Sequence, residues 1–281
     1  MPLIFVPKSQ LLWVRVAALV CTCAAFSVAA HGANLRNDFM ADWSIFCWAF
    51  GFAVTLLVLL VEMFGLQVRA PVSWTNFPVA VAAYAALLCL SASILFPIWF
   101  VRNQPYNQDR SYRVASTVFS CLATLAYVVE VSLTKARPGE VTGYMATAPG
   151  LLKVCETTVA CVIFIMVSDN VPYNHHGALE WCIAVYCICF ILSMGVVVMC
   201  VGECTGYLPV PFPKFLSAYG LLAVAMYLSA TILWPVFQFN KSQHRSSRTP
   251  QVTAVAVLTA VNFLLYLADL AHSARLVFVS V

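Results

Sequence analysis

Long apolar stretches alternate with short polar segments along the whole chain. Eight such stretches occur, each of roughly 17–22 residues, which at about 1.5 Å rise per residue matches a hydrocarbon core of about 30 Å. Their approximate spans are 11–30, 43–63, 77–98, 113–133, 151–167, 181–200, 215–234 and 252–271. Backbone groups in lipid must be hydrogen-bonded within their own segment, and the alternating segments of a membrane barrel are missing from the sequence. Each stretch therefore predicts a transmembrane helix.

The second set of four stretches repeats the first. Residues 91–97 read SASILFP at the end of the third stretch, and residues 229–235 read SATILWP at the end of the seventh. Trp43 opens the second stretch and Trp181 opens the sixth. The offset between the two sets stays near 138–141 residues. The pattern predicts an all-α membrane protein made of a duplicated four-helix unit.

The joint between the two sets is rich in turn-forming residues. Pro138-Gly139 and Pro149-Gly150 stand there, and such pairs break helices. We therefore expect three parts along the chain: a first four-helix unit at 1–137, a connecting loop at 138–150 and a second four-helix unit at 151–281.

Composition excludes several classes of protein. Hydrophobic residues make up 62% of the chain and charged residues only 9%, against about 45–50% and about 25% in soluble proteins. There is no basic run suited to nucleic acid, no glycine-rich phosphate loop and no hydrolase or metalloprotease motif. We therefore expect no enzymatic activity, no cofactor and no nucleic-acid partner. His175 and His176, with Asp169 and Glu180, resemble metal ligands only weakly, and no metal site is expected.

Charged side chains within the stretches gather at one depth. Up-and-down threading brings together the ends of the even-numbered stretches, the second turn of the fifth, and the starts of the first and fifth. The residues placed at this level are Glu62, Glu130, Glu203, Asp269, Glu156, Arg15 and Lys153. Charged groups in a bilayer are costly, so they form pairs or extend to the interface.

We expect these charges to pair across helix ends. The expected pairs are Arg15 with Glu62 or Glu130, and Lys153 with Glu203 or Asp269. The alternative function for the same belt is a rim that binds a partner protein or lipid headgroups. The middle of the eight stretches contains no Asp, Glu, Lys, Arg or His, which argues against an ion-coupled transporter.

Polar side chains also form a stripe on the fourth and eighth stretches at helical spacing. The stripe residues are Ser116, Ser120, Tyr127 and Glu130, and Thr259, Asn262, Tyr266 and Asp269. Such side chains hydrogen-bond between helices in membrane bundles. We expect them to face the bundle interior, with a lipid or ligand groove as the alternative.

Twelve cysteines occur, and ten of them lie inside the stretches as small apolar packing residues. Cys200 and Cys204 differ because they lie at the end of the sixth stretch, and cysteines beside a membrane helix are candidates for S-palmitoylation.

The even number of spans places both termini on one side of the membrane. Eight basic residues lie on that side and seven on the other, so charge does not decide the orientation. A weak glycosylation sequon begins at Asn240 on the second side, close to a helix end.

Several local motifs together resemble a known family. They are LLWVR at 11–15, LLKVCE at 151–156, ARPGEVTGYMAT at 136–147, GEC at 202–204 and ADLAHS at 268–273. Each four-helix set resembles the MARVEL domain, and two copies in one chain are similar to the myeloid-associated differentiation marker family. The likeness covers essentially the whole chain.

The resemblance implies two tandem four-helix MARVEL-type bundles in the plasma membrane and its associated vesicles. It places both termini and the connecting loop at 138–150 on the cytoplasmic side. It also implies a non-enzymatic role in organising cholesterol-rich membrane domains (membrane rafts), in membrane apposition or in vesicle traffic. The partners expected are membrane lipids, cholesterol among them, other membrane or cortical proteins, or further copies of the chain. The alternative function is a channel or transporter built from the duplicated unit. A ligand-sensing receptor ranks third, because no sizeable extracellular domain is present.

Overall fold

The structure, a computed structural model, describes the chain in nine parts. These parts are residues 8–32, 35, 38–69, 71–102, 108–135, 143–168, 177–207, 211–242 and 249–279. All regular structure within them is helical. The chain divides into two compact units, Met1–Thr147 and Ala148–Val281, each of which is described separately below.

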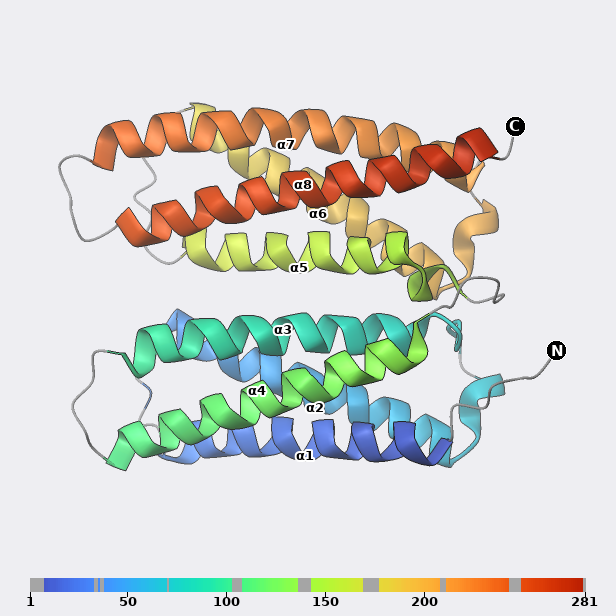
Figure 1. Cartoon of the computed structure of the whole chain (residues 1–281), viewed down its shortest axis with the longest axis vertical. Coiled ribbons are helices and arrows are strands. Elements are labelled where there is room, and N and C mark those ends of the chain that lie inside the picture. The colour runs from blue at the N-terminus through green and yellow to red at the C-terminus, as the bar shows by residue number, and fades with distance from the viewer. Residues whose placement is uncertain are drawn as a thin grey trace. The chain divides into compact units, whose positions relative to one another are not determined.

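The first unit is a closed ring of four antiparallel helices (Figure 1). Each helix packs on the next in sequence, and the fourth returns to pack on the first. The elements are α1 (Lys8–Gly32), α2 (Phe39–Met63), the short 3₁₀ helix η1 (Leu66–Val68), α3 (Phe77–Phe100), α4 (Gln108–Thr134) and the short η2 (Tyr144–Ala146).

The second unit has the same ring of contacts. Its elements are α5 (Ala148–Ser168), α6 (Gly177–Val201), the short η3 (Cys204–Tyr207), α7 (Phe212–Ser242) and α8 (Thr249–Val279). The eight long helices are apolar and long enough to cross a membrane, so the predicted all-α, eight-span architecture is confirmed. α7 and α8 are longer than predicted, since each has 31 residues and extends beyond its apolar stretch.

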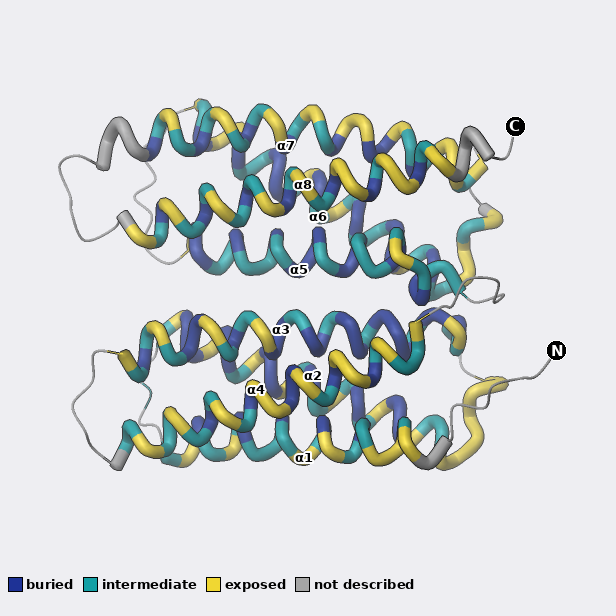
Figure 2. The backbone as a smooth tube through the Cα atoms, viewed as in Figure 1, coloured by how far each residue is buried: buried dark blue, intermediate teal, exposed yellow. Residues whose placement is uncertain are grey.

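Each bundle exposes many large apolar side chains within its spans and buries most of the polar side chains there. In Figure 2 exposed residues recur along α1, α4, α7 and α8 and alternate with buried ones. Leu125, Ile191 and Leu264 are examples of exposed large apolar residues within spans. All eight polar stripe residues of α4 and α8 are buried, so their predicted inward placement is confirmed. In a membrane this arrangement presents hydrocarbon to lipid and keeps polar groups paired within the bundle.

The segment that follows the first four helices is fastened to the first unit. The Asn76 side chain, just before α3, accepts a hydrogen bond from the Met145 backbone N–H at 3.0 Å. A Cβ on Gly143 would lie 2.1 Å from Asn76 Oδ1, so this close approach requires glycine. Met145 and Ala146 are buried. Residues 143–147 therefore pack on the first unit, and α5 begins directly afterwards at Ala148.

The connecting loop at 138–150 lies partly outside the described residues, which begin again at Gly143. Within its described part, residues 144–146 form η2 and residues 148–150 form the first turn of α5. The predicted unit boundaries and the cytoplasmic placement of this loop stay predictions.

Candidate functional site

A cluster of three charged side chains lies inside the first unit. Arg15, near the start of α1, is only 2% exposed. Its Nε atom donates to Glu130 Oε1 of α4 at 2.6 Å, and its Nη1 atom donates to Glu62 Oε2 of α2. Glu130 is buried, whereas the Glu62 side chain is 30% exposed. One guanidinium therefore ties three helices together, because its planar fork presents several donors.

Hydrogen bonds between neutral groups extend this cluster along the first bundle. The Tyr127 hydroxyl of α4 donates to the Gly51 carbonyl of α2 at 2.8 Å and lies 2.7 Å from Thr55 Oγ1. The Trp48 indole N–H donates to Ser120 Oγ at 2.8 Å. Each of these bonds joins α2 to α4 across the bundle interior, where an unpaired polar group would be costly.

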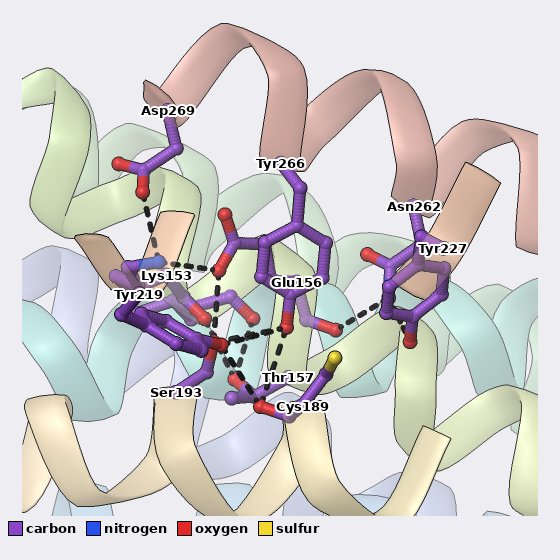
Figure 3. A network of polar contacts seen from close by, with 11 residues as sticks. Lys153, Glu156, Thr157, Cys189, Ser193, Tyr219, Tyr227, Asn262, Tyr266 and Asp269 are labelled. Carbon is purple, nitrogen blue, oxygen red and sulfur yellow. Dashed lines mark hydrogen bonds and ion pairs between the residues drawn. The ribbon is translucent and has the colours of Figure 1, made fainter. Parts of the chain in front are cut away.

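The second unit contains a charged cluster at the equivalent position of the repeat, built around a lysine instead of an arginine (Figure 3). The ammonium Nζ of Lys153 on α5 lies 2.8 Å from Asp269 Oδ2 of α8 and donates to Glu156 Oε2 at 2.9 Å. The side chains of all three are fully buried, with 0% exposed. Nζ also lies 4.6 Å and 5.3 Å from the ring centres of Tyr219 and Tyr266. Those two rings add cation–π attraction in a desolvated setting.

The carboxylate of Glu156 continues into a polar network that reaches every helix of the second unit. Ser193 Oγ of α6 donates to Glu156 Oε2 at 2.9 Å and lies 2.7 Å from the Tyr219 hydroxyl of α7. It also lies 3.0 Å from the Tyr266 hydroxyl of α8. The Tyr219 hydroxyl in turn donates to the Cys189 carbonyl at 3.0 Å. Figure 3 shows these side chains pointing toward one another from α5, α6, α7 and α8.

Neutral side chains close the far end of this network. Asn262 Nδ2 donates to the Tyr227 hydroxyl at 2.8 Å and to the Glu156 backbone carbonyl at 3.3 Å. The rings of Tyr227 and Tyr266 stack with centres 4.9 Å apart. Within the described residues, Glu156 Oε1, Asn262 Oδ1 and Asp269 Oδ1 accept no hydrogen bond. The cluster thus holds two carboxyl groups against one ammonium, all away from the surface.

The electrostatics of both clusters favour fixing helices against one another. A charge in a low-dielectric interior is tolerated only when it is paired and hydrogen-bonded. Charge-assisted bonds of this kind are also shorter and stronger than neutral ones. Removing one partner from such a pair is far more damaging than never having the pair. The clusters are therefore positioned to set how α1, α2 and α4 meet, and how α5 meets α6, α7 and α8.

The structure brings together most of the charges that the sequence placed at one depth. Arg15 contacts both of its candidate partners, and Lys153 contacts Asp269. Glu203 is separate from this group: it is exposed in the turn after α6 with a φ of 56°, and among the described residues it forms no ion pair.

Two of the acidic residues lie at other positions along their helices than predicted. Asp269 does not lie in the last turn of its helix, because α8 continues ten residues beyond it to Val279. Glu156 lies in the third turn of α5 rather than the second, since the helix begins earlier, at Ala148. The pair between Lys153 and Glu156 was missed, although their i,i+3 spacing is a recognised signal for a contact on one helix face.

The other candidate sites have varied placements. Cys200 is buried in α6, which removes it from the surface in this conformation, whereas Cys204 is exposed. Asn240 lies within α7, and its side chain is outside the described part. The weak histidine cluster at 169–176 falls outside the described residues, and Glu180 lies in the first turn of α6.

Comparison with known proteins identifies the family. The family model described as "Membrane-associating domain", MARVEL, matches residues 7–133 and again residues 144–272. A Xenopus laevis protein named "Myeloid-associated differentiation marker homolog" is 49% identical over 292 residues, covering 98% of this chain and 95% of that protein. The chain belongs to the myeloid-associated differentiation marker family.

Two human members of the myeloid-associated differentiation marker family show its breadth. The protein named "Myeloid-associated differentiation marker" is 51% identical over 284 residues, covering 95% of this chain and 88% of that protein. "Myeloid-associated differentiation marker-like protein 2" is 41% identical over 283 residues, covering 94% and 91%. No solved structure matches the chain. The predicted family and the tandem MARVEL organisation are therefore confirmed, and the chain is a multi-pass integral membrane protein.

Proposed function

We propose that this protein is a non-enzymatic organiser of cholesterol-rich membrane domains, acting in membrane apposition or vesicle traffic through lateral contacts. The observation that carries the proposal is the division of its surface: the spans expose large apolar residues, while the charges within them are drawn into paired clusters. Such a surface contacts lipid chains and neighbouring membrane proteins. Membership of a membrane-associating family supports the same proposal. The partners proposed are membrane lipids, cholesterol among them, other membrane or cortical proteins, or further copies of the chain.

A reconstitution experiment tests this role. The purified full chain is placed in giant vesicles that separate into a cholesterol-rich ordered phase and a disordered phase. We expect the protein to enrich in the ordered phase and to change the area of that phase as its density rises. A matched variant, Leu125→Ala with Leu264→Ala, trims the lipid-facing surface and leaves both charge clusters intact. Equal distribution between phases and an unchanged ordered area, at every protein density, would contradict the proposal.

A channel or transporter is the second candidate, and one observation favours it. Glu156, Asp269 and Lys153 form a fully buried charged cluster in a duplicated membrane unit, which is typical of ion-coupled carriers. Ion or substrate flux into liposomes containing the purified chain discriminates the two functions. A saturable flux that is lost in Glu156→Gln would favour transport over membrane organisation.

We also propose that both termini are cytoplasmic, in the plasma membrane and associated vesicles. Thr75 and Arg102 are exposed residues that follow α2 and α3 respectively, so they test opposite sides. On intact cells, an impermeant maleimide is expected to modify Arg102→Cys and to spare Thr75→Cys, with peptide-level mass spectrometry as the readout. The reverse labelling pattern would invert the orientation.

Modification at the end of α6 completes the proposal. Of the two candidate cysteines, Cys204 is exposed and Cys200 is buried, so S-palmitoylation is proposed at Cys204. Acyl exchange on the native protein should report an acylated cysteine that Cys204→Ser removes and Cys200→Ser retains. Under the proposed orientation the Asn240 sequon lies outside, and a glycosidase-sensitive mass shift would reveal its use.

A further inference from the structure

The turn that follows α2 carries large apolar side chains that stay exposed among the described residues of the first bundle. Met63, Phe64, Leu66 and Val68 are exposed by 74%, 70%, 44% and 95%. Residues 63–68, here called the apolar turn, include the end of α2 and the short helix η1. In Figure 2 the segment after α2 is drawn as exposed. Four exposed apolar side chains within six residues are unfavourable in water, because their hydration costs free energy in proportion to the apolar surface.

The apolar turn has a defined backbone. Gly65 adopts a left-handed conformation with a φ of 65°, and its N–H donates to the Glu62 carbonyl at 3.3 Å. The Arg69 N–H donates to the Leu66 carbonyl at 3.0 Å, which closes η1. Glu62, immediately before the turn, is held by Arg15. The turn is therefore fixed at the end of α2 rather than being free to fold its side chains onto the bundle.

The exposed face of α2 continues into the apolar turn. Leu57 and Leu60 are exposed at a spacing of three residues, and Met63 and Phe64 continue the same face. This face contacts lipid within the span Phe39–Met63. The turn also connects that span to the next one, Phe77–Phe100, so it is held at the membrane surface. Apolar side chains at this level insert about 5–10 Å into the boundary between headgroups and acyl chains.

We propose that the apolar turn is embedded in the lipid headgroup interface of the leaflet in which α2 ends. The repeat supplies a matched control, because the second unit places small or polar residues at the equivalent positions: Gly202 for Phe64, Cys204 for Leu66 and Gly206 for Val68. When Cys204 carries no acyl group, the turn of the second unit is not expected to enter the lipid. The inference relies only on the membrane-spanning part of the proposed function, so an outcome against it leaves the organising role to be tested separately.

The experiment compares labelling from lipid with labelling from water. The native full chain is first treated with hydroxylamine, which removes any thioester-linked acyl group from Cys204. It is then reconstituted in phosphatidylcholine bilayers with a lipid that carries a photoactivatable diazirine near its headgroup. A parallel sample receives a water-soluble, impermeant diazirine instead, and mass spectrometry maps the labelled residues in both. We expect residues 63–68 to have a lipid-to-water labelling ratio several-fold above that of residues 202–206 and of Thr75, which is exposed in the same loop.

Two reciprocal variants sharpen the test. Phe64→Ser with Val68→Ser should lower the ratio in the first unit to the level of the second. Cys204→Leu with Gly206→Val should raise the ratio in the second unit, and open space around Gly206 permits that change. Equal ratios in the two native turns would overturn the proposal. Protection of residues 63–68 from both reagents would also overturn it, since a second copy or a protein partner would then cover the turn.

Discussion

The two units share one ring of four helices and place one cation at the same position, yet they neutralise it differently. Arg15 receives its two carboxylates from α2 and α4, which are different helices. Lys153 receives one from α8 and the other from its own helix. The repeat explains the change: Cys200 stands at the position equivalent to Glu62, and Glu156 stands at the position equivalent to Ala18.

The difference shows which feature of the site the fold requires. The cation on the first helix and the acid on the last helix are present in both units, whereas the second acid has moved. Moving it changes the exposure of the cluster, because Glu62 is partly exposed and Glu156 is fully buried. In the first unit the Glu62 side chain can therefore extend to the membrane interface, whereas in the second unit the fully buried Glu156 cannot.

Removal of the cation from the second unit should have the largest effect. Lys153→Met leaves two carboxyl groups buried without their counter-charge, a change that typically costs about 3–5 kcal/mol. The free energy of unfolding, measured by steric trapping in bicelles, is the readout. Adding Glu156→Gln and Asp269→Asn to the same chain should recover most of the loss, because no charge then remains to be buried. If Lys153→Met lowered the free energy of unfolding by less than about 1 kcal/mol, the cluster would not be fully shielded from water.

The corresponding change in the first unit should cost less. Arg15→Gln leaves Glu130 buried, but Glu62 can reach the interface, so we expect a loss of about 2–3 kcal/mol. Double-mutant cycles separate the contributions of the two acids. The coupling free energy between Arg15→Gln and Glu130→Gln should exceed that between Arg15→Gln and Glu62→Gln. Strictly additive losses in both cycles would show that the charges act independently and only extend to the interface.

Loss of a neutral hydrogen bond should have a smaller effect. Tyr127→Phe removes the bonds to the Gly51 carbonyl and the Thr55 hydroxyl, and Tyr266→Phe is the matched change in the second unit. Each should lower the free energy of unfolding by about 1 kcal/mol. The same trapping assay measures both. A loss above about 3 kcal/mol in either would mean that the hydroxyl supports the charge cluster directly.

Neutralising the additional acid of the second unit should have the smallest effect. Glu156→Gln relieves the excess of carboxyl groups, keeps the Lys153–Asp269 pair and retains an oxygen for the Ser193 hydroxyl. We expect a change within about 0.5 kcal/mol, against about 2 kcal/mol for Glu130→Gln in the first unit, where the principal buried acid is lost. A larger loss from Glu156→Gln than from Glu130→Gln would reverse the comparison between the units.

The fold was predictable because lipid imposes length and apolarity on every span, and because the repeat excludes other threadings. The depth of the charges followed from the same alternation, which is why Arg15 could be matched with the acids of α2 and α4. The choice between those acids was not predictable, since one guanidinium accommodates both.

The polar network of the second unit was only half predictable. Asn262 and Tyr266 belong to a periodic stripe, but Ser193 and Tyr219 lie in α6 and α7, which have little amphipathic pattern. A helix without an amphipathic pattern does not indicate which face turns inward. The rotation of α6 and α7, and with it the partners of Glu156, therefore depends on packing that the sequence pattern does not display.

The contact between Asn76 and Met145 bears on the order of events during synthesis. The first unit reaches its last internal contact only when the chain has been made as far as residues 143–147, well after α4 is complete at Thr134. The very next residue, Ala148, begins α5. At translation rates of about 5–20 residues per second, the last contact of one bundle and the first turn of the next leave the ribosome almost together. Insertion of the second unit thus begins while the contact between Asn76 and Met145 forms in the first.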